Sequence, residues 1–178
     1  GTKIGMGWPE RFDVIEWIKL IISWEPNAQI ILHGVSMGAA TVLMASGEEL
    51  PENVKVIIAD CGYTSEWDEF KCEANALHIP WFPVLNAASV MSRLRDGYDF
   101  KQASALEKVK QSRIPTLFIH GSDDELVPYS MLDKLYSAAA CEKECLTVNG
   151  AGHALSSSVE PELYWNTVEN FIEKYLEK

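Results

Sequence analysis

Short apolar runs alternate with segments of helical periodicity along most of this chain. The apolar runs have the length and composition of buried strands, and they cover residues 29–33, 54–60, 114–120 and 144–149. Helical patterns occupy residues 9–25, 36–48, 129–140 and 161–175. Strands that alternate with helices form right-handed crossovers, which leave neighbouring strands parallel. The sequence therefore predicts an α/β fold with a mostly parallel sheet.

One long segment, from about residue 63 to residue 111, interrupts this alternation. A crossover between parallel strands needs only one helix, so the segment contains additional structure. Pro80 and Pro83 divide it, and it is rich in aromatic residues: Trp67, Phe70, Trp81, Phe82, Tyr98 and Phe100. We expect a helical cap insertion over the carboxyl edge of the sheet, with aromatic side chains that wall an apolar pocket.

Composition narrows the classes of partner. The 178 residues fit one domain, and an apolar content of 47% is sufficient for a core at this length. The formal net charge of −11 disfavours nucleic acids and anionic membrane surfaces. No apolar run reaches the ~18 residues of a membrane span. The cysteines lack paired spacing, so we expect reduced thiols and a cytoplasmic location, with an upstream membrane anchor as the alternative.

A serine stands between two glycines where the first strand-like run meets a helix, in the order Gly34, Val35, Ser36, Met37, Gly38. This G-x-S-x-G pattern is typical of a nucleophile elbow, in which the serine lies at the tip of a sharp turn. Side chains at positions 34 and 38 would then collide with the neighbouring strand and helix. The amino terminus of a helix stabilises negative charge, and the N–H of Met37 would donate to an oxyanion. We interpret Ser36 as a nucleophile, with an ordinary turn serine as the alternative.

Acidic residues and a histidine follow later strands at their carboxyl ends, where open α/β sheets bind ligands. The third apolar run leads into Asp123, Asp124 and Glu125, and the fourth leads into His153 in a glycine-rich loop. The order serine, acid, histidine along the chain is the one that accompanies a nucleophile elbow. Asp60, at the end of the second run, is an alternative acid.

The other three histidines are weaker candidates for a functional role. His33 and His120 each precede a glycine at the end of a strand, and we interpret them as residues that shape the backbone. His78 is expected on the surface of the cap. Because no histidine lies at zinc-ligand spacing from a cysteine, the sequence predicts no metal site.

Three motifs together resemble the α/β-hydrolase superfamily, in its serine-aminopeptidase-like and esterase-like group: HGVSMG at 33–38, IHGSDDELVP at 119–128 and GAGH at 150–153. The family pattern H-G-x-x-D-x-x-V-P places its aspartate on Asp124. The resemblance implies a triad of Ser36, Asp124 and His153, with Met37 N–H in the oxyanion hole. It implies a small-molecule carboxylic ester or a peptide amide as substrate, and no metal or organic cofactor.

The resemblance has one gap, because such hydrolases begin with further strands before the elbow strand. We therefore expect residues 1–178 to be the carboxyl-terminal portion of a longer hydrolase domain, with the amino-terminal strands missing. The second oxyanion donor would lie outside this chain, and the missing half or a second copy would cover the open sheet edge. The alternative function is that of a catalytically inactive fragment that serves as an association module.

Overall fold

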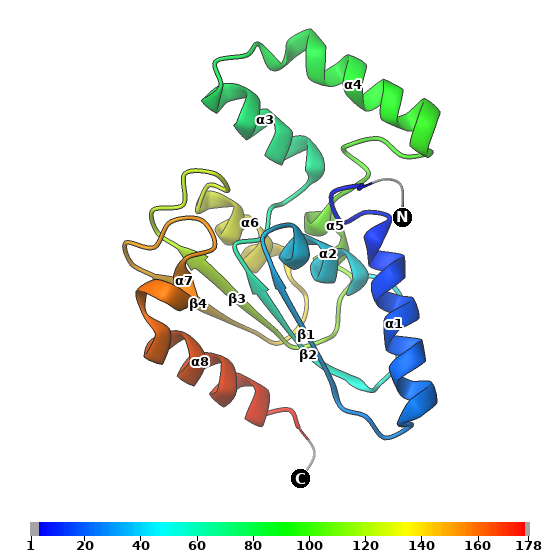
Figure 1. Ribbon diagram of the computed structural model, residues 1–178, viewed down its shortest axis with the longest axis vertical. Coiled ribbons are helices and arrows are strands. Elements are labelled where there is room, and N and C mark those ends of the chain that lie inside the picture. Colours follow the sequence, from blue (N-terminus) through cyan, green and yellow to red (C-terminus); the bar gives the residue numbers. More distant parts are fainter. Residues whose placement is uncertain (1–3, 177–178) are drawn as a thin grey trace.

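The computed structural model describes residues 4–176, which contain a four-stranded parallel sheet (Figure 1). Strands β1 (Ile30–Val35), β2 (Val54–Asp60), β3 (Thr116–Gly121) and β4 (Lys143–Val148) lie in that order across the sheet. Each pair of neighbours is parallel. The predicted α/β fold with a parallel sheet is confirmed, and each strand begins and ends within two residues of its expected bounds.

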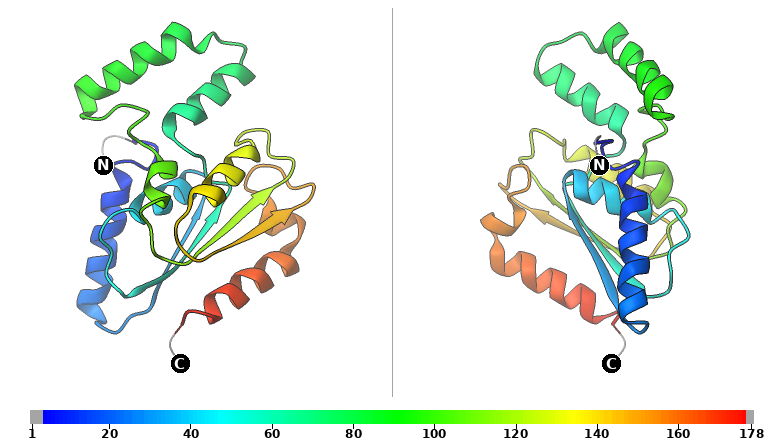
Figure 2. Two further views of the ribbon diagram at one scale, coloured as in Figure 1. Left: turned by 180° about the vertical axis from the view of Figure 1, so that it is seen from behind. Right: turned by 45° about the vertical axis from the view of Figure 1, so that its right-hand side comes forward.

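Helices cover both faces of the sheet (Figures 1 and 2). Helices α1 (Glu10–Trp24), α2 (Met37–Ala45) and α6 (Ser130–Ala138) lie on one face, and α7 (Ser156–Val159) and α8 (Pro161–Glu173) lie on the other. Because side chains alternate along a strand, Ile57 and Ala59 of β2 pack with the first layer and Val56 and Ile58 pack with α8. Each buried aliphatic side chain contributes roughly 1.5–3 kcal/mol, so the sheet depends on both helical layers.

Strand β1 lies at one edge of the sheet, and among residues 4–176 it pairs with β2 alone. Its residues alternate between buried and exposed positions, and Ile31 and Val35 are 36% and 42% exposed. His33 lies on the same face and contacts Tyr164 of α8. An apolar edge strand with an uncovered face can pair with another chain. We propose that a further segment of the polypeptide or a second copy covers this edge.

The 178-residue chain by itself is therefore expected to self-associate through β1. Lysine at position 31 would place a charge on the uncovered face, and lysines on edge strands block pairing. Sedimentation velocity over a broad concentration range should show oligomers for the parent chain and a monomer for Ile31→Lys. Leu163→Lys, at a 46% exposed position of α8, is the control and should behave like the parent. A parent chain that stays monomeric throughout would contradict the proposal.

The segment between β2 and β3 forms helices α3 (Glu66–Ala76), α4 (Trp81–Asp96) and α5 (Ala105–Val109). Helices α3 and α4 form a hairpin that stands beyond the carboxyl ends of the strands (Figure 1). A bridge between Ser65 and Ser104 joins the two segments that connect this hairpin to the sheet. Helix α5 differs, because Ala105 and Val109 are buried in the core with residues of α2. The cap therefore consists of α3 and α4, and α5 belongs to the body of the fold.

Two glutamates are buried at the base of this cap. Glu66 and Glu69, in the first turn of α3, are each 3% exposed. In the part of the chain that the structure describes, the Oε2 atom of each has no hydrogen-bond partner. Burial, together with the nearby carboxylates of Glu10 and Asp96, raises the pKa of Glu66 to about 8. Burial and the nearby Glu73 raise the pKa of Glu69 to about 7, so the fold favours the neutral form of both groups.

Replacing Glu66 by glutamine should stabilise the protein at alkaline pH. Folding raises the pKa of Glu66 from 4.5 to about 8. The wild-type protein therefore keeps its full stability below about pH 4.5 and loses stability as the pH rises from there to about 8. The free energy of unfolding, measured in urea, should differ little between Glu66→Gln and wild type at about pH 4.5. It should favour the variant by roughly 2–4 kcal/mol above about pH 8. Glu73→Gln, on the same helix but partly exposed, is the control; an equal gain at both pH values would contradict the prediction.

Two other sequence-based expectations concern membranes and thiols. Within residues 4–176, no helix has both the length and the apolar character that crossing a bilayer requires. The cysteines are free thiols, as expected: Cys61, Cys72, Cys141 and Cys145.

Candidate active site

Ser36 lies at the turn between β1 and α2, at the carboxyl edge of the sheet. Its φ of 55° and ψ of −119° form a backbone conformation that residues with side chains rarely adopt. The N–H of Ser36 donates to the carbonyl of Asp60 at 2.8 Å, and α2 begins at Met37. Backbone strain of this kind is concentrated at functional sites. The turn presents the hydroxyl of Ser36 at the junction of strand and helix.

The two glycines that flank Ser36 differ in what they contribute. A side-chain carbon at Gly34 would overlap the carbonyl group of Gly38, so position 34 requires glycine. Outside the neighbouring residues and the backbone of α2, a side-chain carbon at Gly38 would meet no atom of residues 4–176 within 4 Å. The prediction that both positions exclude side chains is therefore right for Gly34 and wrong for Gly38, which faces open space.

The ring of His153 lies between Ser36 and Asp124 and contacts both. Its Nε2 is 2.7 Å from Oγ of Ser36, and its Nδ1 is 2.8 Å from Oδ2 of Asp124. The three residues come from the turn after β1, the loop after β4 and the loop after β3. Because the carboxyl ends of parallel strands meet at one edge of a sheet, the fold brings together side chains that are far apart in the sequence.

The carboxylate of Asp124 is buried and accepts several hydrogen bonds. Its side chain is 0% exposed, and Oδ1 accepts from the backbone N–H groups of Leu126 and Val127 at 3.0 and 2.9 Å. Nε2 of His120 lies 3.3 Å from Oδ2. Burial opposes ionisation, but hydrogen bonds from His120, His153 and Val127 outweigh it and lower the pKa of Asp124. Asp124 is therefore an ionised acceptor that can fix the ring of His153.

Asp60, the alternative acid, is bound to other groups. It is 2% exposed at the end of β2, where the hydroxyl of Ser156 donates to Oδ1 at 3.4 Å and Tyr164 forms a further hydrogen bond. The hydroxyl of Tyr164 also lies 3.0 Å from Nε2 of His33. Burial raises the pKa of Asp60, although these hydrogen bonds oppose the rise. The described contacts of Asp60 join α7 and α8 to the sheet and do not include His153.

The structure also places the remaining candidates. Asp123 and Glu125 are exposed, and His78 is exposed at the turn before α4. His120 has a role that the sequence interpretation missed. Its buried ring lies against the carboxylate of Asp124, as well as shaping the loop through a contact with a backbone carbonyl at 2.9 Å. The sequence feature that could have predicted this contact is the position of His120 four residues before Asp124.

Cys61 is a neighbour of the site that the sequence did not predict. Its Sγ lies within 4.8 Å of a ring nitrogen of His153 and a carboxylate oxygen of Asp124. Burial, reinforced by the nearby Asp60, raises the pKa of the thiol to about 12. Attack on a substrate would need the thiolate, so the neutral thiol disfavours a second nucleophile here.

Met37 is the first residue of α2. Backbone N–H groups in the first turn of a helix have no partner within the helix, and the positive end of the helix dipole lies there. An anion forming next to Ser36 would meet this end of α2, and the predicted role of Met37 N–H stays a prediction.

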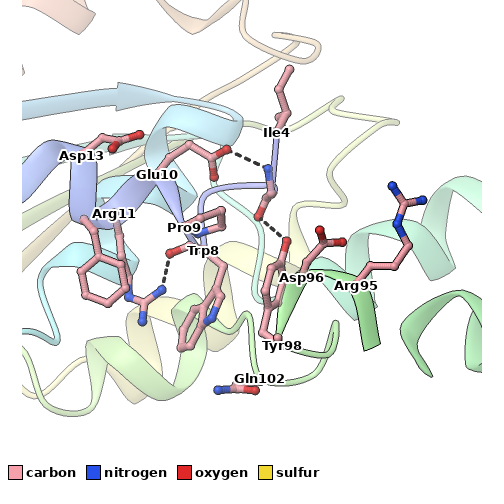
Figure 3. Close-up of a pocket in the computed structure, with 13 residues that line it drawn as sticks. Ile4, Trp8, Pro9, Glu10, Arg11, Asp13, Arg95, Asp96, Tyr98 and Gln102 are labelled. Carbon is pink, nitrogen blue, oxygen red and sulfur yellow. Dashed lines mark hydrogen bonds between the residues drawn. The ribbon is translucent and has the colours of Figure 1, made fainter. Parts of the chain in front are cut away.

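A pocket of about 740 Å³ lies between the start of α1 and the loop after α4 (Figure 3). There the carboxylate of Glu10 accepts from the N–H of Gly5 at 2.7 Å, and Tyr98 donates to the carbonyl of Gly5. No residue of the Ser36–His153–Asp124 set lines this pocket. Several of the predicted cap aromatics pair with one another instead: Trp67 with Trp81, Trp81 with Phe82, and Phe70 with Phe100. An aromatic acyl pocket beside Ser36 therefore stays a prediction.

Known proteins resemble this chain along most of its length. The profile of the prolyl oligopeptidase family matches residues 10–178. YqkD, an uncharacterized protein of Bacillus subtilis, is 28% identical over 175 residues, which cover 97% of this chain and 57% of that protein. Human alpha/beta hydrolase domain-containing protein 17C is 30% identical over 106 residues, which cover 58% of this chain and 32% of that protein. The chain thus spans about half the length of YqkD and a smaller share of the human relative.

Solved structures share the fold at low sequence identity. An esterase of Pyrococcus furiosus has a TM-score of 0.77 at 19% identity, over 99% of this chain and 66% of that chain. Acylaminoacyl peptidase of Pyrococcus horikoshii has a TM-score of 0.72 at 17% identity, over 95% of this chain and 28% of that chain. These similarities confirm the predicted sheet of α/β-hydrolase type. Together with the profile match over residues 10–178, they show that this chain belongs to the prolyl oligopeptidase family of the α/β-hydrolase superfamily.

Proposed function

We propose that this chain carries the catalytic centre of a serine hydrolase, with Ser36 as nucleophile, His153 as general base and Asp124 as the acid. The observation that supports this most strongly is the unbroken chain of hydrogen bonds from Oγ of Ser36 through the ring of His153 to the carboxylate of Asp124, at 2.7 and 2.8 Å. A serine hydroxyl is a weak nucleophile until a positioned base takes its proton. His153 lies within the distance that such a transfer requires.

In the acylation step, Oγ of Ser36 attacks the carbonyl carbon of the substrate while Nε2 of His153 takes the hydroxyl proton. His153 then gives this proton to the leaving group, and an acyl ester of Ser36 remains. Water, deprotonated by the same nitrogen, hydrolyses the ester and restores the hydroxyl. The ionised Asp124 keeps the proton on Nδ1, so that Nε2 stays an acceptor, and it stabilises the charged ring.

The oxyanion that forms during attack needs hydrogen-bond donors. We assign one of them to the N–H of Met37, which the dipole of α2 supports. A single donor of this kind contributes about 10²–10³ in rate, so a second donor matters. We expect that donor from the part of the relatives' length that this chain does not span.

Carboxylic esters with a small or medium acyl group are the proposed first class of substrate, and peptide amides are the second. Esters have the better leaving group, so their hydrolysis requires less from the oxyanion donors. An esterase among the structural neighbours supports the first class. The acylaminoacyl peptidase neighbour and the name of the family support the second.

A series of p-nitrophenyl esters of increasing acyl length, compared with the p-nitroanilide of the same acyl group, tests this function. The polypeptide should be used together with any segment that precedes residue 1. We expect the largest kcat/KM for short to medium acyl esters and a lower value for the matched amide. Hydrolysis of neither class by a folded protein would contradict the proposal and favour the inactive association module.

A further inference from the structure

Helix α4 directs large apolar side chains to solvent, and two of its three buried side chains are serines, beside Leu85. Four large apolar side chains on its outer face are 55% to 78% exposed: Val84, Val90, Met91 and Leu94. On the opposite face, the hydroxyl of Ser89 accepts from the N–H of Phe100, and the hydroxyl of Ser92 donates to the carbonyl of Tyr98. Both serines are buried. A surface helix that contacts only water has the reverse pattern.

The turn that precedes α4 and the first residues of α4 are also apolar and exposed. Leu77, Ile79 and Phe82 are 70%, 47% and 65% exposed. The ring of Trp81, the first residue of α4, packs edge to face against Phe82 and Trp67. The exposed apolar side chains of the turn and of α4 are together called the cap surface: Leu77 and Ile79 of the turn, and Phe82, Val84, Val90, Met91 and Leu94 of α4.

The charge pattern separates the cap surface from the rest of the protein. Residues 74–92 contain no Asp, Glu, Lys or Arg, although such residues make up 23% of the chain and give it a net charge of −11. Arg93 is exposed at the border between the outer and inner faces of α4. A long basic side chain at such a border can keep its charged end in water while the outer face of the helix is buried against a partner.

The position of α4 leaves the cap surface open. In Figures 1 and 2, α4 lies at the extremity of the molecule, and α3 lies between α4 and the carboxyl edge of the sheet. The loops that carry Asp124 and His153 leave the sheet at that same edge. Exposed apolar patches of this kind mark interaction sites.

We propose that the cap surface docks on an uncharged lipid surface. The seven side chains of the cap surface offer no hydrogen-bond donors, and residues 74–92 carry no Asp, Glu, Lys or Arg side chain that could pair with a partner protein. A lipid surface needs neither, and aromatic side chains beside an apolar helical face suit the boundary between headgroups and acyl chains. Anionic lipid would repel the acidic body of the protein, so the complementary surface is neutral. This docking does not depend on the proposed function.

Flotation with phosphatidylcholine vesicles tests the docking, with Ser36→Ala beside the parent so that binding is measured without catalysis. Both proteins should float with the vesicles, and high salt should not release them. Met91→Glu combined with Leu94→Glu should lower the partition coefficient by about tenfold or more, because two large apolar side chains lose their transfer from water. Trp17→Glu combined with Leu20→Glu, at exposed positions of α1, is the matched control and should bind like the parent. If the double variant at α4 does not fold, Leu94→Glu alone, at the 78% exposed position, replaces it.

Tryptophan fluorescence shows which element enters the lipid. Phosphatidylcholine brominated on its acyl chains should quench part of the emission, and Trp81→Phe should lose that part. Binding that requires anionic lipid and is reversed by salt would overturn the proposal. The proposal would also be overturned if the parent did not bind vesicles but formed a dimer that Leu94→Glu dissociates. The partner of the cap surface would then be a second copy of the chain. Vesicle binding without ester hydrolysis would count against the proposed function and leave the docking intact.

Discussion

Replacing Ser36 by alanine is expected to lower kcat/KM for ester hydrolysis by at least about 10³-fold. Without Oγ, the base 2.7 Å away has no hydroxyl to deprotonate, and no acyl-enzyme can form. The change removes only the hydroxyl oxygen and keeps the Cβ atom, so alanine can adopt the same backbone conformation as serine. The fold should therefore persist. Steady-state kinetics with the best ester of the p-nitrophenyl series, together with a thermal melt of each protein, measures both effects.

Ser158→Ala is the matched control for this experiment. Ser158 is exposed on α7, one turn beyond the loop that carries His153, and its replacement should leave kcat/KM unchanged. Equal hydrolysis by the Ser36→Ala protein and the parent would show that another residue is the nucleophile.

Asp124→Asn is expected to lower kcat by about 10³–10⁴-fold with little effect on KM. An amide at position 124 can donate a hydrogen bond to Nδ1 of His153, which moves the ring proton to Nε2. That nitrogen then cannot take the proton of Ser36. The substitution preserves the shape of the side chain, so the contact of 2.8 Å should remain while the tautomer of His153 changes.

Asp60→Asn distinguishes the two candidate acids. Asp60 contacts Ser156 and Tyr164, so its replacement should change the stability of the protein and leave kcat close to the parent value. Comparing kcat and the urea midpoint for both variants separates a catalytic effect from a structural one. A large loss of kcat in Asp60→Asn, with activity kept in Asp124→Asn, would reverse the assignment of the acid.

The parts of the fold that the sequence predicted well rest on local patterns. A buried parallel strand is a short continuous apolar run, and the run at residues 54–60 matches β2 at both ends. The placement of candidate residues at strand ends also follows from chain order, because parallel strands share one carboxyl edge. This is why Asp124 and His153 could be expected near Ser36 before any distance was known.

The features that the sequence did not predict depend on contacts between distant segments. β1 continues to Val35 because Gly34 and Val35 pair with Ala59 and Asp60 of β2, a register that no local pattern contains. Gly38 was expected to be crowded, but the space around it depends on surrounding segments.

Burial and neighbours also decide the roles of charged and polar groups. The contact between His120 and Asp124 exists because the loop after β3 folds back on the strand. The inverted faces of α4 become visible only when the segment after it is placed against Ser89 and Ser92. Periodicity alone assigns an apolar face to a helix but does not say whether that face is inside.

Mapping the site of a fluorophosphonate adduct tests the catalytic assignment most directly. Fluorophosphonates react with serines that are activated by a base, so peptide mass spectrometry of the labelled protein identifies the nucleophile itself. The adduct is expected on Ser36, in the peptide that joins β1 and α2. Labelling should disappear in Ser36→Ala and weaken strongly in Asp124→Asn. An adduct on another serine, or a folded and complete protein that takes up no label, would contradict the assignment of Ser36, His153 and Asp124 as a catalytic triad.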